Sequence, residues 1–209
     1  MEKRLFLCLL GLAFVADMYF IFQGESLLRF YTKPLLMPFL MLYYLTSSIS
    51  GKIDFFLYAG LLMSFFGDFF LLFHWGFVPG LISFLLAHVA YIYCFKRKSA
   101  GRLSVMATIG IGLYALVMIV LLYPYLGTMQ IPVMVYTVVI STMLYWGIAA
   151  RQWWIGIGAM LFVISDTVLS VHLFVRPSVW SEMLVMLLYV SAQVAIVFGV
   201  KQWNARAAT

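Results

Sequence analysis

The chain has 209 residues, of which 66% are hydrophobic and only 10% are charged. Soluble domains carry roughly 25% charged residues, so this composition excludes an ordinary water-soluble domain and predicts a single integral membrane domain over residues 1–209. The 13 Lys and Arg exceed the 7 Asp and Glu, but the basic residues fall mostly in predicted loops, where they orient a membrane protein, so we expect no nucleic-acid partner.

Apolar runs separated by short polar breaks predict an all-α fold, a multi-pass transmembrane bundle of about eight helices. A hydrocarbon core of roughly 30 Å needs about 20 residues per helix, and each run approaches that length. The second run is the shortest and fits a tilted or partly interfacial segment, and Thr32-Lys33-Pro34 before it predicts a turn. The predicted helices cover residues 5–22, 34–49, 53–73, 77–95, 103–123, 131–149, 153–175 and 180–200.

The basic residues predict that both termini are cytoplasmic. With the N-terminus inside, ten Lys and Arg fall in inner segments, and three, Arg29, Lys33 and Arg176, fall in outer loops. Cytoplasmic segments of membrane proteins are enriched in Lys and Arg. We therefore expect an integral multi-pass protein of the bacterial plasma (inner) membrane with an even number of spans.

Three acidic residues lie inside the predicted spans and away from the helix ends: Asp17, Asp68 and Asp166, on the first, third and seventh helices. A carboxylate at the bilayer centre costs roughly 3 kcal/mol on insertion scales, and such residues usually serve a function. The three helices run in the same direction, and a rise of 1.5 Å per residue puts the three acids within about 6 Å of one depth. We expect one cavity in the outer half of the bundle to gather these acids with His88.

Asp68 and Asp166 share a local pattern, because a small residue directly precedes each and a leucine follows three residues later. Helical spacing places other polar residues on inward faces beside them. These supporting residues are Ser64, His88, Tyr91, Tyr189 and Gln193. Gly60, Ser64 and Gly67 form a small-residue stripe that permits close helix approach. Each polar residue can instead be a structural contact between helices, and Asp17 can simply pair with Lys33 or a nearby hydroxyl.

Two buried carboxyls support several kinds of chemistry. Burial disfavours the charged form, and two close carboxyls can share a proton. One acid can then donate a proton while the other stabilises positive charge, which suits acid-catalysed hydrolysis of a lipid-soluble substrate, proton-coupled transport or intramembrane proteolysis. The sequence Phe65-Phe66-Gly67-Asp68 lacks the first glycine of the Gly-x-Gly-Asp signature of intramembrane aspartyl proteases, which disfavours proteolysis.

Several short motifs, in their order and spacing, resemble the YhhN family over nearly the whole chain. They are Thr32-Lys33-Pro34, Gly67-Asp68, the Gly80-to-Tyr91 stretch with Phe84 and His88, Ser165-Asp166, and Tyr189-x-x-Ala192-Gln193. The characterised members of that family are lysoplasmalogenases, multi-pass proteins that hydrolyse a vinyl ether. The resemblance therefore implies an ether hydrolase that cleaves a lysophospholipid into a fatty aldehyde and a glycerophospho-head group.

The implied chemistry assigns roles to the polar residues. Asp68 or Asp166 would protonate the vinyl ether, and the other would stay anionic to oppose the oxocarbenium ion and orient water. Lys33 and Arg176 would hold the lipid phosphate. We expect membrane lipid around the protein and no metal or cofactor. The alternative function is a non-catalytic lipid-binding or proton-coupled transport protein that uses the same cavity.

Overall fold

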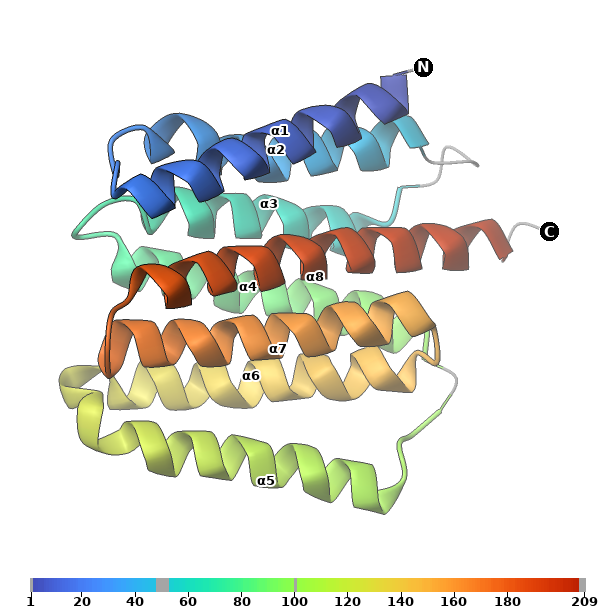
Figure 1. The fold of residues 1–209 in the computed structure, drawn as a ribbon. Coiled ribbons are helices and arrows are strands. Elements are labelled where there is room, and N and C mark those ends of the chain that lie inside the picture. Colours follow the sequence, from blue (N-terminus) through green and yellow to red (C-terminus); the bar gives the residue numbers. More distant parts are fainter. Residues whose placement is uncertain (1, 48–52, 100, 207–209) are drawn as a thin grey trace. The chain divides into compact units, whose positions relative to one another are not determined.

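The computed structural model describes residues 2–47, 53–99 and 101–206 of the chain (Figure 1). Within these ranges it contains eight α-helices, two single-turn 3₁₀ helices and no β-strand, which confirms the predicted all-α fold. The helices are α1 (Glu2–Gln23), α2 (Arg29–Ser47), α3 (Phe55–Phe70), α4 (Phe77–Arg97), α5 (Val105–Leu122), η1 (Tyr123–Tyr125), η2 (Gly127–Met129), α6 (Gln130–Ala149), α7 (Trp153–Phe174) and α8 (Val179–Arg206).

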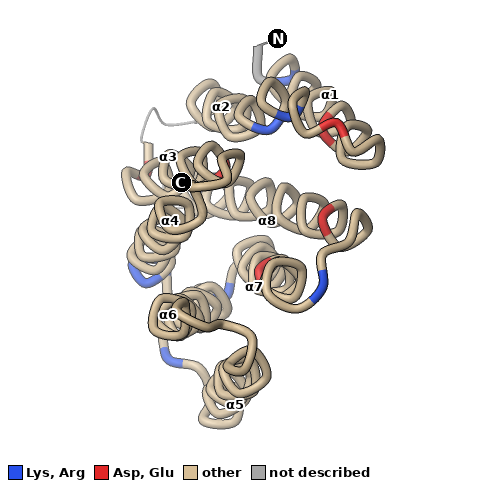
Figure 2. The backbone as a smooth tube through the Cα atoms, turned by 90° about the vertical axis from the view of Figure 1, so that its left-hand side faces the viewer, with Lys and Arg blue, Asp and Glu red and all other residues tan. Residues whose placement is uncertain are grey.

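Six of the described helices, α1 and α4 to α8, are long and apolar enough to cross a membrane. Figure 2 shows how sparsely Lys, Arg, Asp and Glu are distributed along the backbone. Large apolar side chains remain exposed along these helices, as on α5, where most of the surface is unburied. Such a surface is stable against lipid tails and unstable against water. The chain is therefore an integral membrane protein, and the cytoplasmic position of both termini remains a prediction.

The described chain separates into two compact units. Unit 1 comprises Met1–Tyr91 and Val200–Thr209, and unit 2 comprises Ile92–Gly199. Helices α4 and α8 each contribute residues to both units. One membrane domain over the whole chain remains a prediction.

In unit 1, α2 lies between α1 and α3 and packs on both of them. Helices α3 and α4 approach closely because two glycines of α3 face aromatic rings of α4. A Cβ atom on Gly67 would lie 2.6 Å from a ring carbon of Phe84, and a Cβ atom on Gly60 would overlap the ring of Tyr91. The predicted role of the small-residue stripe in close helix approach is thus confirmed for both glycines.

In unit 2, α6 packs on α7, and α5 packs on both. Close approach again depends on glycine. A Cβ atom on Gly158 of α7 would lie 2.7 Å from Cγ1 of Ile196 on α8, and one on Gly147 of α6 would lie 2.5 Å from Cβ of Ala159. The buried side of α7 therefore faces α6 and α8.

The predicted boundaries of the second helix are wrong at its start. Helix α2 begins at Arg29 and continues through Pro34 and Pro38, so Thr32-Lys33-Pro34 is helical and not a turn. Proline usually interrupts helices, but next to lipid the backbone gains most from keeping its internal hydrogen bonds. The shortest helix is α3, with 16 residues, not α2, with 19. The predicted helix end at residue 49 lies outside the described residues.

Candidate active site

Asp68 of unit 1 is paired with a cation from α2. Asp68 lies in the last turn of α3 and is 2% exposed, and Nζ of Lys33 lies 3.8 Å from its Oδ1 atom. The sequence pattern places Lys33 in an outer loop, and that prediction is wrong, because Lys33 belongs to α2 and is itself buried. Its ammonium group reaches the carboxylate from α2. The two side chains form a buried ion pair.

The other supporting residues of unit 1 line the contact between α3 and α4. Ser64, His88 and Tyr91 are all fully buried. Phe84 and Tyr91 meet the glycines of α3, and His88 lies between them on the same face of α4. The predicted grouping of these side chains on inward faces is therefore confirmed within this unit, in the helix pair that carries Asp68.

Asp17 forms a second buried contact with α2. Its Oδ1 atom accepts hydrogen bonds from Arg29 Nε at 3.3 Å and from Thr32 Oγ1 at 2.9 Å. Of the two partners anticipated from the sequence, the nearby hydroxyl is correct and Lys33 is not. Like Lys33, Arg29 belongs to α2, so its predicted place in an outer loop is also wrong. Arg29 and Lys33 are one turn apart, and α2 thus pairs one cation with α1 and the next with α3.

Asp166 of unit 2 has a different kind of partner. The Tyr136 hydroxyl of α6 donates a hydrogen bond to Asp166 Oδ2 on α7. Beside it, the hydroxyls of Tyr114 on α5 and Thr167 on α7 are 2.7 Å apart and share a hydrogen bond. The phenols of Tyr136 and Tyr114 therefore contact two consecutive residues of α7, Asp166 and Thr167. Sequence reasoning missed both tyrosines, although a tyrosine inside an apolar helix needs a partner for its hydroxyl, and that signal was present.

The remaining predicted residues of unit 2 lie on α8 or just before it. Tyr189 and Gln193 are buried on α8, and the ring of Tyr189 packs edge-on against Phe162 of α7 with centroids 5.4 Å apart. Ser165 Oγ donates a hydrogen bond to the Val185 carbonyl at 3.0 Å, so the residue before Asp166 fastens α7 to α8. Arg176 lies exposed between α7 and α8, as predicted.

The two carboxyls belong to different units, Asp68 to unit 1 and Asp166 to unit 2. Their convergence in one cavity remains a prediction. Among the residues that the structure describes, no three His, Cys, Asp or Glu side chains are placed to share a metal ion.

Comparison with known proteins gives relatives named lysoplasmalogenase. The chain is 32% identical over 148 residues to lysoplasmalogenase TMEM86B of Sus scrofa, in an alignment covering 70% of this chain and 63% of that protein. It is 30% identical over 133 residues to a lysoplasmalogenase of Mycobacterium bovis, covering 60% of this chain and 51% of that protein. The matched part thus spans between half and two thirds of these relatives' length. No solved structure matches the chain.

A family model supplies the broader assignment. The model of the YhhN family matches residues 28–200, which include α2 to α7 and most of α8. Asp68 with its partner from α2 and Asp166 with its partner from α6 both lie in the matched range. This protein is a member of the YhhN family.

Proposed function

We propose that this protein is a lysoplasmalogenase-type ether hydrolase, which cleaves the vinyl ether of an alkenyl lysophospholipid with two intramembrane aspartates. The names of its curated relatives support the substrate class. The observation that carries the proposal is the difference in partners: Asp68 is in an ion pair with Lys33, and Asp166 is hydrogen-bonded to the Tyr136 phenol.

That difference assigns the two roles. The ammonium group of Lys33 beside Asp68 suits the role of the carboxylate that opposes a cation, so Asp68 is not the proposed proton donor. Asp166 is partly exposed, and a protonated carboxylic acid can still accept the hydrogen bond from Tyr136. Asp166 is therefore the proposed general acid and Asp68 the proposed electrostatic stabiliser.

The reaction then proceeds in balanced steps. Asp166 transfers its proton to the β-carbon of the vinyl ether, and the ether oxygen stabilises the positive charge as an oxocarbenium ion opposite anionic Asp68. Water adds to the cationic carbon and returns a proton to the Asp166 carboxylate. The resulting hemiacetal collapses to a fatty aldehyde and the free hydroxyl of the glycerophospho-head group.

The other residues have supporting roles in this proposal. His88, Tyr91 and Ser64 hold water or tune Asp68 from the α3–α4 contact, while Tyr189 and Gln193 stabilise α8 beside α7. Asp17 supports the site indirectly by anchoring α2, which carries Lys33. Arg176, exposed in its loop, is the proposed partner of the lipid phosphate, and the buried ion pair favours a role for Lys33 as the counter-ion of Asp68 over its predicted contact with phosphate.

Release of aldehyde by purified protein tests the proposal. The wild-type chain, reconstituted in nanodiscs, is expected to convert 1-O-hexadecenyl lysophosphoethanolamine to hexadecanal and glycerophosphoethanolamine in equal amounts. The saturated 1-O-hexadecyl analogue is the control, because it has no double bond to protonate. Binding of both lipids without aldehyde from either would refute the hydrolase and support the lipid-binding or transport alternative.

We further propose that the protein lies in the bacterial plasma membrane with both termini cytoplasmic. The ten-to-three bias of basic residues supports this orientation, although Arg29 and Lys33 of the smaller group are helical. Reporter fusions at Thr209 and near Gly127 are expected to report opposite sides of the membrane. Reporters on the same side would refute the eight-span topology.

A further inference from the structure

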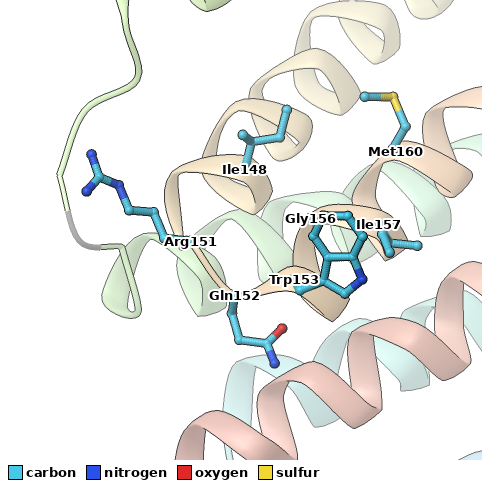
Figure 3. A pocket seen from close by; sticks show the side chains of 7 residues that line it. All are labelled: Ile148, Arg151, Gln152, Trp153, Gly156, Ile157 and Met160. Carbon is cyan, nitrogen blue, oxygen red and sulfur yellow. The ribbon is translucent and has the colours of Figure 1, made fainter.

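One side of α7 in unit 2 is hollowed along much of its length. A pocket of about 450 Å³ lies where α6 ends and α7 begins, beside Gly156, Ile157 and Met160 (Figure 3). A second pocket of about 400 Å³ lies between α5, α6 and α7, beside Met160, Ile164 and Thr167. Met160 lines both pockets, so they adjoin each other. Residues 157, 160, 164 and 167 are spaced three or four apart, so they form a stripe along one face of α7.

The two ends of this stripe differ in chemistry. At one end, Thr167 shares its hydrogen bond with Tyr114 and directly follows Asp166, which is bonded to Tyr136. From there to Ile157 the stripe itself is apolar, and the second pocket has no charged residue in its lining. The groove is therefore polar at the end beside the proposed acid and apolar along the stripe from Ile164 to Ile157, and Arg151 and Gln152 line its far end (Figure 3).

The length of the groove matches a lipid chain. Ten residues separate Thr167 from Ile157, which is about 15 Å along a helix axis. This is half of the roughly 30 Å hydrocarbon core, the depth that the chains of one leaflet cover. A further helix, about 10 Å across, does not fit a groove of this volume, and an extended peptide would leave its backbone groups without hydrogen bonds in lipid. A single hydrocarbon chain has neither difficulty.

We infer that this groove, from Thr167 past Met160 to Gly156, binds the alkenyl chain of the lysolipid and sets the preferred chain length. The inference rests on the proposed function, because Asp166, which directly precedes Thr167 in the chain, is the proposed acid. The chain enters with its vinyl ether beside Asp166 and its terminal methyl toward Gly156. The hydroxyls of Tyr114 and Thr167 bound the polar end, so the first carbons of the chain lie beside them.

Two glycines in the groove provide a direct test. A Cβ atom on Gly110 of α5 would meet nothing within 4 Å, and one on Gly156 would touch only the Gly147 carbonyl oxygen, at 3.9 Å. A larger side chain therefore fits at either position and fills the groove, near its polar end at Gly110 and at its far end at Gly156. Gly112 of α5 is the matched control, since it also has open space around it but lines neither pocket.

The experiment measures binding of two saturated ether lipids to the full chain in nanodiscs, with binding to empty nanodiscs subtracted. The probes are 1-O-hexadecyl and 1-O-octyl glycerophosphoethanolamine, which bind without being cleaved. Gly156→Phe is expected to weaken hexadecyl binding about tenfold, equivalent to 1.4 kcal/mol, and to leave octyl binding within about twofold of wild type. Gly110→Phe should weaken binding of both, and Gly112→Phe should weaken neither.

A graded series, Gly156→Ala and Gly156→Leu, covers the case in which the phenylalanine variant does not fold. The inference is refuted if the ratio of hexadecyl to octyl affinity is the same in the wild type, the Gly156 variants and Gly112→Phe. The proposed function is refuted separately if the wild-type protein binds both probes but releases no aldehyde from the alkenyl lysolipid. That result would not contradict the inferred binding groove. If the Gly156 variants release aldehyde with the chain-length dependence of the wild type, the inferred groove is refuted and the proposed hydrolase activity is not.

Discussion

Each unit of the molecule contains an aspartate within a span, in the same local pattern, yet the two carboxylates have opposite surroundings. In unit 1, Asp68 is deeply buried and faces the ammonium group of Lys33, and Asp17 faces the guanidinium group of Arg29. In unit 2, Asp166 is partly exposed and accepts a hydrogen bond from a phenol. The two acids thus share a small residue before Asp and a leucine three residues after it, but their partners come from different neighbouring helices.

The neighbouring helices explain the difference. The two cations paired with the carboxylates of unit 1, Arg29 and Lys33, lie one turn apart on α2, which packs between α1 and α3. The phenols of unit 2 come from α5 and α6, which carry no charged residue between Val105 and Ala149. In unit 1 a cation faces the carboxylate, whereas in unit 2 a phenol donates a hydrogen bond to it. The proposed division of labour between acid and stabiliser is based on this contrast.

The largest expected effect comes from replacing either carboxylate. Asp166→Asn and Asp68→Asn should each lower kcat by about 10²–10⁴-fold, because asparagine preserves size but neither donates the proton nor opposes the cation. The comparison predicts a difference in the residual rates. Without its acid, Asp166→Asn relies on hydronium ions, so its rate should rise about tenfold for each unit of falling pH, whereas Asp68→Asn should keep the pH profile of the wild type.

Asp54→Asn is the matched control for these two variants. Asp54 caps the start of α3 through hydrogen bonds to the amides of Phe56 and Leu57, and asparagine caps helices as well as aspartate does. Its turnover should equal that of the wild type. If Asp68→Asn instead acquired the hydronium dependence and Asp166→Asn did not, the roles of the two acids would be reversed.

The second effect concerns the ion pair of unit 1. Lys33→Met retains the apolar stem but leaves Asp68 buried without its cation, a change that typically costs about 3–5 kcal/mol of stability. We expect a lower melting temperature and a fall in kcat of about 10–100-fold, since an uncompensated carboxylate tends to take up a proton and lose its charge. Lys33→Arg should retain most activity.

Kinetics separate this role from the phosphate contact predicted for Lys33 from the sequence. A contact with phosphate is present in both ground state and transition state, so its loss would raise KM and leave kcat unchanged. The double variant Lys33→Met with Asp68→Asn should regain stability relative to Lys33→Met alone, because no buried charge is left without a partner. A rise in KM without a fall in kcat in Lys33→Met would refute the role of Lys33 as the counter-ion of Asp68.

Sequence patterns predicted the helices better than the partners of the acids. Apolar run length identified all eight α-helices, and the cost of a charge in lipid identified Asp17, Asp68 and Asp166. Helix α2 was misjudged because proline and lysine usually mark a loop, and a single sequence does not show that α2 packs on both α1 and α3. Tyr136 was missed because contacts between α6 and α7 depend on helix rotation, which single-sequence periodicity does not define in a uniformly apolar segment.

The third effect tests the phenols of unit 2. Tyr136→Phe removes the hydrogen bond to Asp166 without changing the ring, and kcat should fall about tenfold, in line with a hydrogen bond to an ionisable group. Tyr114→Phe removes only the bond to Thr167, and its effect on kcat should be smaller. Steady-state kinetics with the alkenyl lysolipid measure both. Equal losses in the two variants would show that Asp166 does not depend specifically on Tyr136.

The smallest effect on turnover is expected at Asp17, and it separates the two carboxylates of unit 1. Asp17 Oδ1 accepts from Arg29 and Thr32, so Asp17→Asn weakens the contact of α1 with α2 and should lower the melting temperature by roughly 5 °C. Turnover per folded molecule should fall by less than about threefold, because Asp17 acts only by anchoring the helix that carries Lys33. Thr32→Val, which removes the hydroxyl and keeps the ion pair, should give a smaller shift in melting temperature. Thermal unfolding in detergent and kcat measured on the same samples decide the matter. A loss of turnover as large as that of Asp68→Asn, at an unchanged melting temperature, would make Asp17 a third acid of the reaction. It would contradict the distinction between a structural ion pair at Arg29 and a catalytic one at Lys33.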